Sequence, residues 1–82
     1  MEGKIKAAMC QFAVSSDIEK NSAVIIKYIE LAAAKGADIV SFPECALSGY
    51  AGADRETLED IDWELLREHT LKIMQAGKKN CI

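Results

Sequence analysis

The spacing of apolar residues changes along the chain, and each spacing predicts a different element. Residues 4–14 become nearly continuous in apolar side chains after the first few positions, which is typical of a strand covered on both faces. Over residues 19–35 the apolar residues recur at steps of three to four and form one stripe, and this predicts a helix. Asp17 or the serine before it is the expected N-cap. Gly36 is the expected end, because glycine takes the left-handed conformation at low cost.

A second strand follows that helix. Residues 38–42 form a short apolar run, and Pro43 ends it because proline cannot donate a hydrogen bond to a sheet. Residues 45–53 are rich in small side chains and are expected to form a loop. Residues 54–60 are expected to hold one short helical turn.

A second helix is expected over residues 63–76, with Asp62 as its N-cap and Gly77 as its end. Cys81 and Ile82 resemble the first step of a third strand. The apolar face of this helix is expected to consist of Trp63, Leu66, Ile73 and Met74.

The order strand, helix, strand, helix predicts an α/β fold. A strand–helix–strand unit of this size places its two strands parallel through a right-handed crossover. The helices can then cover only one face of the sheet, and an apolar edge stays open. We therefore expect residues 1–82 to be an incomplete domain, the front part of a longer protein that is cut at its third strand.

Composition and charge argue against several classes of function. Half of the 82 residues are apolar, 28% are charged and the net charge is −3. This is a globular composition, and without a basic stripe we expect no nucleic-acid partner. The apolar runs are too short for a membrane span. Three cysteines without a secretory signal predict reduced thiols and a cytoplasmic location, and neither they nor His69 show the spacing of a metal site.

Glu44 is the first candidate for chemistry, because it follows an apolar strand and a proline. Ligands bind at the carboxyl ends of strands in open α/β sheets. Partial burial there would raise the pKa of the carboxyl group and make it a usable general base. The alternative is a solvated carboxylate or a cap within the following loop. Tyr50 could line the pocket beside Glu44, or could simply pack on the strand ends.

Several short motifs occur together in a fixed order over residues 4–52. They are Gln11-Phe12, Asn21 at a helix start, Ala33-Ala34 with Gly36-Ala37-Asp38, then Phe42-Pro43-Glu44 and Ser48-Gly49-Tyr50. This set resembles the beginning of the nitrilase superfamily, the carbon–nitrogen hydrolases. The resemblance implies a four-layer α-β-β-α sandwich, of which this chain supplies the N-terminal βαβα portion.

The resemblance also implies an activity: hydrolysis of non-peptide carbon–nitrogen bonds in amide, N-carbamoyl or nitrile substrates. In the family a cysteine is the nucleophile, a glutamate is its general base and a lysine stabilises the intermediate. Glu44 matches the glutamate, whereas no cysteine or lysine here lies in the other two motifs, so the isolated chain is expected to be inactive. Cys45 adjoins Glu44 but does not occupy the nucleophile's motif. No cofactor is implied, and the full-length protein is expected to form a homo-oligomer.

Two other function classes stay open. The chain could be a non-catalytic binding or assembly module that docks through its open sheet edge. It could also be a small α/β ligand-binding domain, although residues 49–52 lack the lysine and helix start of a phosphate-binding loop. Among the remaining residues, we expect Cys10 and Trp63 in the core, Gln11 and Asn21 in structural roles, and His69 at the solvated surface.

Overall fold

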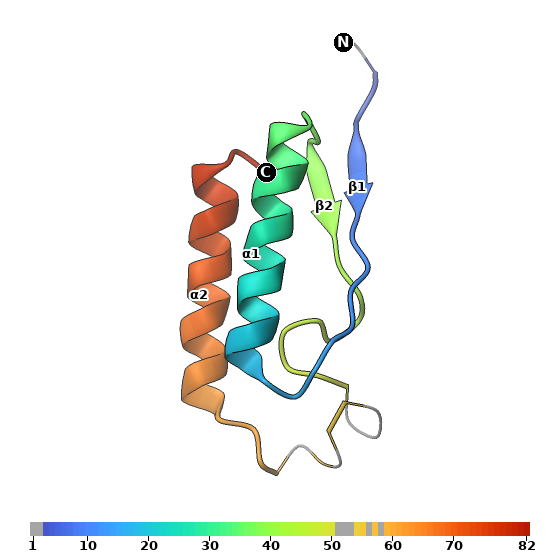
Figure 1. Cartoon of the computed structure of the whole chain (residues 1–82). Helices are drawn as coiled ribbons and strands as arrows, with labels where there is room; N and C mark the ends of the chain where they lie inside the picture. Colours follow the sequence, from blue (N-terminus) through green and yellow to red (C-terminus); the bar gives the residue numbers. More distant parts are fainter. Residues whose placement is uncertain (1–2, 51–53, 56, 58) are drawn as a thin grey trace.

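The computed structural model describes residues 3–50, 54–55, 57 and 59–82. It confirms the α/β class and the βαβα order (Figure 1). The strands pair in parallel, with Ala8 opposite Val40 at the centre of the register. The elements are β1 (Ala7–Met9), α1 (Ile18–Ala34), β2 (Ile39–Ser41) and α2 (Trp63–Lys79).

Both strands are shorter than the apolar runs predict. Regular pairing covers three residues of each strand, and one further bond joins the Cys10 amide to the Ser41 carbonyl at 2.9 Å. β2 ends at Ser41, two residues before Pro43, which has no amide hydrogen with which to continue the ladder. Residues 11–14 continue the direction of β1 without a partner strand among the described residues.

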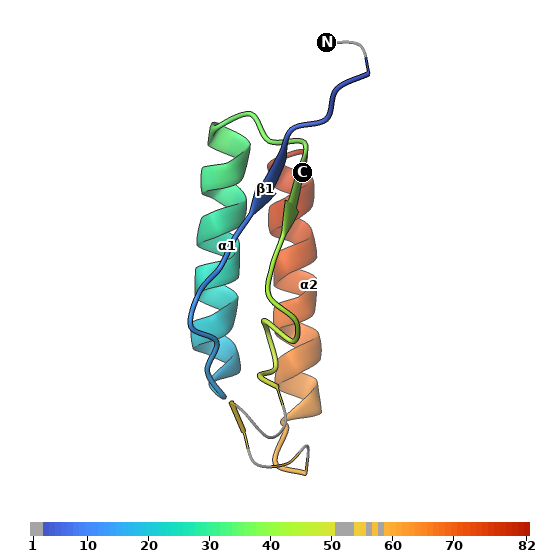
Figure 2. The same cartoon turned by 90° about the vertical axis from the view of Figure 1, so that its right-hand side faces the viewer.

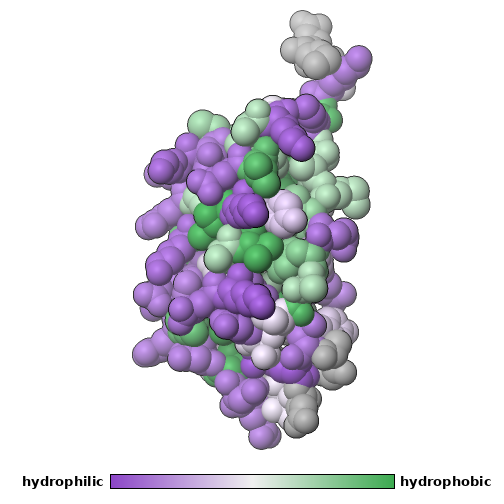
Figure 3. All heavy atoms as spheres, in the orientation of Figure 1, coloured by the Kyte–Doolittle hydropathy of each residue, from purple (hydrophilic) through white to green (hydrophobic). Residues whose placement is uncertain are grey.

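The two helices lie on the same side of the sheet, as expected (Figures 1 and 2). Ala8 and Val40 point toward the helices and are half-buried, whereas Met9 is 80% exposed and Ile39 55% exposed on the other face. On the face shown in Figure 3, hydrophobic residues gather over the strands and the adjoining part of α1, and hydrophilic ones predominate over α2. The prediction that the first strand is covered on both faces is therefore wrong for the part of the chain described here.

Helix α1 begins and ends as predicted. The Asp17 side chain accepts a hydrogen bond from the Lys20 amide at 3.1 Å and caps the first turn. At the other end Gly36 has a φ of +80°, the left-handed conformation expected after a last helical turn. Ile25 and Ile29 of this helix form the core cluster together with Ala46. Partly buried apolar residues pack against the cluster: Phe12, Val14, Val40, Phe42, Leu47, Ile73, Ala76 and Ile82.

Helix α2 begins where predicted but ends later. Asp62 accepts from the Leu65 amide at 3.0 Å and caps the start. The helix then continues through Gly77 to Lys79, and a third strand does not begin at Cys81. Instead Cys81 is left-handed with a φ of +58°, and the Ile82 amide returns to the Gly77 carbonyl at 3.0 Å. This is a Schellman ending, in which cysteine occupies the position that glycine usually takes.

The packed face of α2 differs from the predicted one. Ile73 packs against the core and Leu66 is half-buried, but Trp63 and Met74 are exposed. The face that meets α1 includes His69, which is half-buried, with its Nδ1 2.9 Å from the Oγ of Ser22. A residue spacing of three to four also fits a stripe through His69 and Ile73, and this stripe makes the contacts with Ser22 and with the core. The expectations of a core Trp63 and a solvated His69 are wrong.

Residues 54–60 do not contain the expected helical turn in the positions that the structure describes, which are 54–55, 57 and 59–60. Residues 51–53 of the expected loop lie outside the described residues. No helix in the described part of the chain is both long and apolar enough to cross a membrane.

Candidate functional site

Glu44 lies just beyond the carboxyl end of β2. Phe42 and Pro43 lead out of the strand into a turn of residues 44–48, called here the Glu44 turn, in which the Gly49 amide donates to the Cys45 carbonyl at 2.9 Å. The turn lies beyond the arrowheads of both strands (Figure 1), the edge where α/β proteins place their chemistry. The Glu44 side chain is exposed, so the partial burial expected for it does not occur in this chain.

Asn21 fixes the Glu44 turn from the first turn of α1. Its side chain is 1% exposed, and its amide nitrogen donates to the carbonyls of Ser15 at 2.7 Å and Leu47 at 2.9 Å. Its oxygen accepts from the Ser15 amide at 3.0 Å and lies 3.2 Å from the Ser15 hydroxyl. Every polar atom of this buried amide is therefore satisfied. The structural role expected for Asn21 is confirmed.

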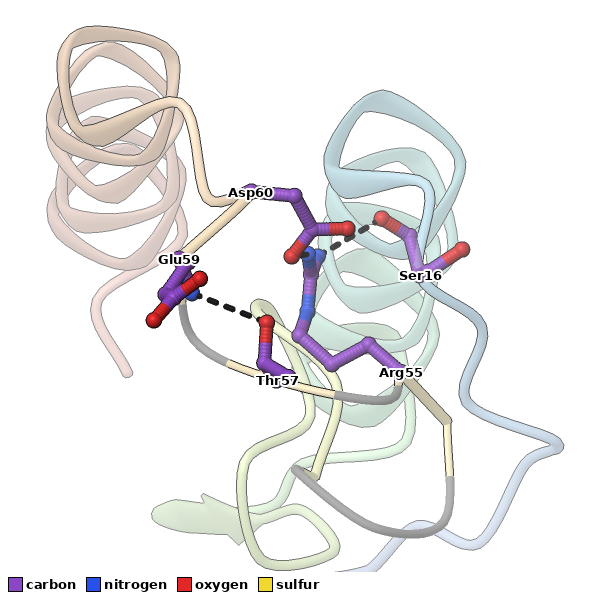
Figure 4. Close-up of a pocket in the computed structure, with 5 residues that line it drawn as sticks. All are labelled: Ser16, Arg55, Thr57, Glu59 and Asp60. Atoms are coloured by element: carbon purple, nitrogen blue, oxygen red, sulfur yellow. Dashed lines mark hydrogen bonds and ion pairs between the residues drawn. The ribbon is translucent and has the colours of Figure 1, made fainter.

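Arg55 is the residue that the sequence prediction missed. It is only 8% exposed, and its Nε donates to the Ser48 carbonyl while one terminal nitrogen donates to the Ser16 carbonyl, both at 2.8 Å. The other terminal nitrogen lies 3.1 Å from Oδ1 of Asp60 (Figure 4). The signal in the sequence is that Arg55 is the one basic residue in the acidic segment 54–62.

A glycine allows the close contact beside Arg55. Gly49 has a φ of +84°, and a Cβ built there would lie 2.9 Å from the Ser15 carbonyl oxygen. Real Cβ atoms do not approach that closely, so the main chain after the Glu44 turn passes directly against the segment before α1. The tyrosine that follows, Tyr50, is about half exposed, and its amide donates to Asp54 Oδ2 at 2.8 Å.

A hollow in the described part of the chain lies beside Arg55 and is not lined by Glu44. An open hollow of about 520 Å³ is lined by Ser16, Arg55, Thr57, Glu59 and Asp60 (Figure 4). The guanidinium in its wall already donates to two carbonyls and an aspartate. This hollow is therefore the outer surface of a structural cluster, and we do not assign the substrate to it.

The three cysteines are free thiols: Cys10 is half-buried, and Cys45 and Cys81 are exposed. Cys10 is thus only partly buried, whereas a position in the core was expected. Gln11 is exposed, and its side chain makes no hydrogen bond among the described residues. Across the same residues, no group of three or more His, Cys, Asp or Glu side chains is placed to hold a metal ion.

The fold and the Glu44 turn together define an α/β protein that presents a carboxylate at the carboxyl ends of two parallel strands. The family model described as carbon–nitrogen hydrolase matches residues 6–82. The match covers nearly the whole chain and confirms the resemblance found in the sequence. The chain belongs to the carbon–nitrogen hydrolase family. Neither the curated proteins nor the solved structures yield a significant match.

Proposed function

We propose that this chain supplies the general base, Glu44, of a hydrolase that acts on non-peptide carbon–nitrogen bonds in amide, N-carbamoyl or nitrile substrates. The observation that carries the proposal is the place of Glu44: it follows a parallel strand at the carboxyl edge of the sheet, in a turn held by the buried amide of Asn21. Membership of the carbon–nitrogen hydrolase family supports the reaction class.

The proposed chemistry uses Glu44 to remove a proton from a cysteine thiol. With an amide or N-carbamoyl substrate, the thiolate attacks the carbonyl carbon, a lysine stabilises the developing oxyanion, the proton held by Glu44 passes to the leaving ammonia or amine, and water then hydrolyses the thioester. With a nitrile, the thioimidate that forms first takes up one water before ammonia leaves, and a second water then releases the acid. We propose that neither the nucleophile nor this lysine is among residues 1–82. Cys45 directly follows Glu44, and neighbouring side chains generally point in different directions, so its thiol is not our candidate.

Tyr50 is proposed as a substrate contact. It lies two residues after the Glu44 turn and is about half exposed, while its main chain is anchored to Asp54. An exposed aromatic ring on an anchored main chain can form one wall of a pocket. We also propose that the full-length protein forms a homo-oligomer and that it is located in the cytoplasm.

The role of Glu44 can be tested in two proteins. The 82-residue chain should release no ammonia from a panel of amides, N-carbamoyl amino acids and nitriles. A chimera in which residues 6–82 replace the matching segment of an active carbon–nitrogen hydrolase should be active. In the chimera Glu44→Gln should lower kcat/KM by about 10²–10⁴-fold, the usual contribution of a general base.

The matched control is Glu30→Gln, an exposed glutamate on α1, which should leave the activity of the chimera unchanged. Full activity in the chimera with Glu44→Gln would rule out Glu44 as the base. Turnover by the 82-residue chain alone, lost on the same substitution, would show that the chain contains its own nucleophile.

A second candidate function is a binding or assembly module, and the open sheet face favours it. Ile5, Met9 and Ile39 are all more than half exposed on or beside this face. Exposed apolar surface of this kind marks interaction sites, and strand addition at the open edge is one way to cover it. Concentration-dependent size in solution is the observation that supports this alternative.

A further inference from the structure

We infer that Arg55 is a positioning residue of the proposed hydrolase site: it clamps the end of the Glu44 turn to the segment that precedes α1. The catalytic meaning of the clamp rests on the proposed role of Glu44. The clamp itself is inferred from the contacts of Arg55, and amide hydrogen exchange tests it without any measurement of activity.

The geometry of the guanidinium makes Arg55 suited to this task. Its Nε and one terminal nitrogen each donate to a main-chain carbonyl, those of Ser48 and Ser16, at 2.8 Å. The donors belong to one rigid plane, so together they fix the distance between the two carbonyls. A lysine ammonium is a single point at the end of a flexible chain and cannot hold both in the same way.

The clamp works in parallel with Asn21. Asn21 joins Ser15 to Leu47, and Arg55 joins the next residue of each segment, Ser16 to Ser48. Two adjacent carbonyls of the Glu44 turn are thus held by side chains from different parts of the chain. The close approach of Gly49 to the Ser15 carbonyl shows that the two segments touch.

Burial and charge indicate a structural task for Arg55 and not a substrate contact. The Arg55 side chain is almost fully buried, whereas its partner Asp60 is largely exposed. Solvent screens the attraction to Asp60, so the carbonyl bonds account for more of the placement. If Arg55 were removed, both carbonyls would lose this donor, and the loss is costly at Ser48, which is half-buried.

The test is amide hydrogen exchange of the ¹⁵N-labelled 82-residue chain, followed by nuclear magnetic resonance. The Gly49 amide, bonded to the Cys45 carbonyl, reports on the Glu44 turn, and the Ile29 amide reports on the core of α1. In Arg55→Lys the protection of Gly49 should fall about tenfold or more, while that of Ile29 changes by less than about twofold, because local opening is separable from global unfolding.

Two further variants sharpen the comparison. Arg67→Lys changes an exposed arginine on α2 in the same way and should alter neither amide. Asp60→Asn removes the ion pair but keeps the carbonyl bonds, so the protection of Gly49 should fall by less than in Arg55→Lys. An equal loss of protection at Gly49 and Ile29 in Arg55→Lys, or no loss at Gly49, would overturn the clamp.

A wild-type measurement keeps the inference testable if Arg55→Lys does not fold. The Arg55 Nε–H should exchange as slowly as the Gly49 amide, because one opening of the turn exposes both. Rapid exchange of the Nε–H would refute the clamp. These readouts measure no activity, so loss of the proposed role of Glu44 in the chimera leaves them unaffected. In an active chimera, Arg55→Lys should lower kcat more than it changes KM.

Discussion

At the scale of single residues, the buried polar side chains organise the candidate site. Asn21, Ser22 and Arg55 are the buried polar residues in the described part of the chain, and each bonds to a group on a different segment. A buried polar group is costly unless it is paired, so these residues tie the segments together specifically. The role of Asn21 was predictable from its place at a helix start. That of Arg55 was not, because it depends on the main-chain carbonyl of Ser16, 39 positions earlier in the sequence.

Comparison of Gly49 with Gly36 can measure the energetic effect of the close contact between Gly49 and the segment before α1. Both have left-handed φ values, +84° and +80°, but a Cβ at Gly49 meets the Ser15 carbonyl at 2.9 Å and a Cβ at Gly36 meets nothing within 4 Å. Gly36→Ala should lower the free energy of unfolding by about 1 kcal/mol, the cost of the left-handed conformation. Gly49→Ala should cost roughly 1–3 kcal/mol more, because the clash adds strain.

Urea unfolding followed by circular dichroism measures both changes. If the two substitutions lowered the free energy of unfolding equally, the close contact between Gly49 and the segment before α1 would not exist in solution.

At the scale of elements, local signals predicted where helices begin better than where they end. Asp17 and Asp62 both cap as expected, because an N-cap bond forms within four residues of sequence. The end of α2 depends on Ile82. Its side chain packs against the core and its amide donates to the Gly77 carbonyl, so the helix continues beyond Gly77. The choice of packed face on α2 also depends on α1, through His69 and Ser22. Neither contact is visible in the local pattern.

The Schellman ending of α2 provides a prediction at this scale. Cys81 is exposed and left-handed, with a φ of +58°, and a side chain there costs about 1–2 kcal/mol that glycine avoids. Cys81→Gly should therefore raise the free energy of unfolding by about 0.5–1 kcal/mol, since the greater freedom of glycine in the unfolded chain offsets part of the gain.

Cys81→Ala is the control, because it removes the thiol but keeps the left-handed strain, and it should leave the stability nearly unchanged. A thermal melt under reducing conditions compares the three proteins. A Cys81→Gly protein that melts no higher than Cys81→Ala would mean that the ending of α2 is frayed in solution.

At the scale of the whole molecule, the alternation of strands and helices was sufficient to predict the α/β class, the parallel pairing and the uncovered sheet face. The reason is physical. The helix that connects two neighbouring strands returns the chain to the end of the sheet where the first strand began, so the second strand runs parallel to it. The two helices of this chain then lie on one face of the sheet and leave the other open. The place of Glu44 at the carboxyl edge of the sheet followed from the same topology, because Phe42 and Pro43 alone separate it from the end of β2. The surroundings of Glu44 did not follow, because they depend on which groups lie across the open side of the sheet.

The open face leads to the prediction that belongs to this scale. Ile39 and Met9 are exposed on the same face of the two paired strands, where Ile39 lies opposite Ala7 and Met9 opposite Ser41. Apolar surface next to an unpaired strand edge promotes association. The apparent mass of the 82-residue chain in sedimentation equilibrium should therefore rise with concentration. Ile39→Lys should suppress the rise, since association would have to bury a charge. Leu71→Lys, on an exposed position of α2, should not. Equal suppression by both substitutions would mean that net charge, and not this face, controls association.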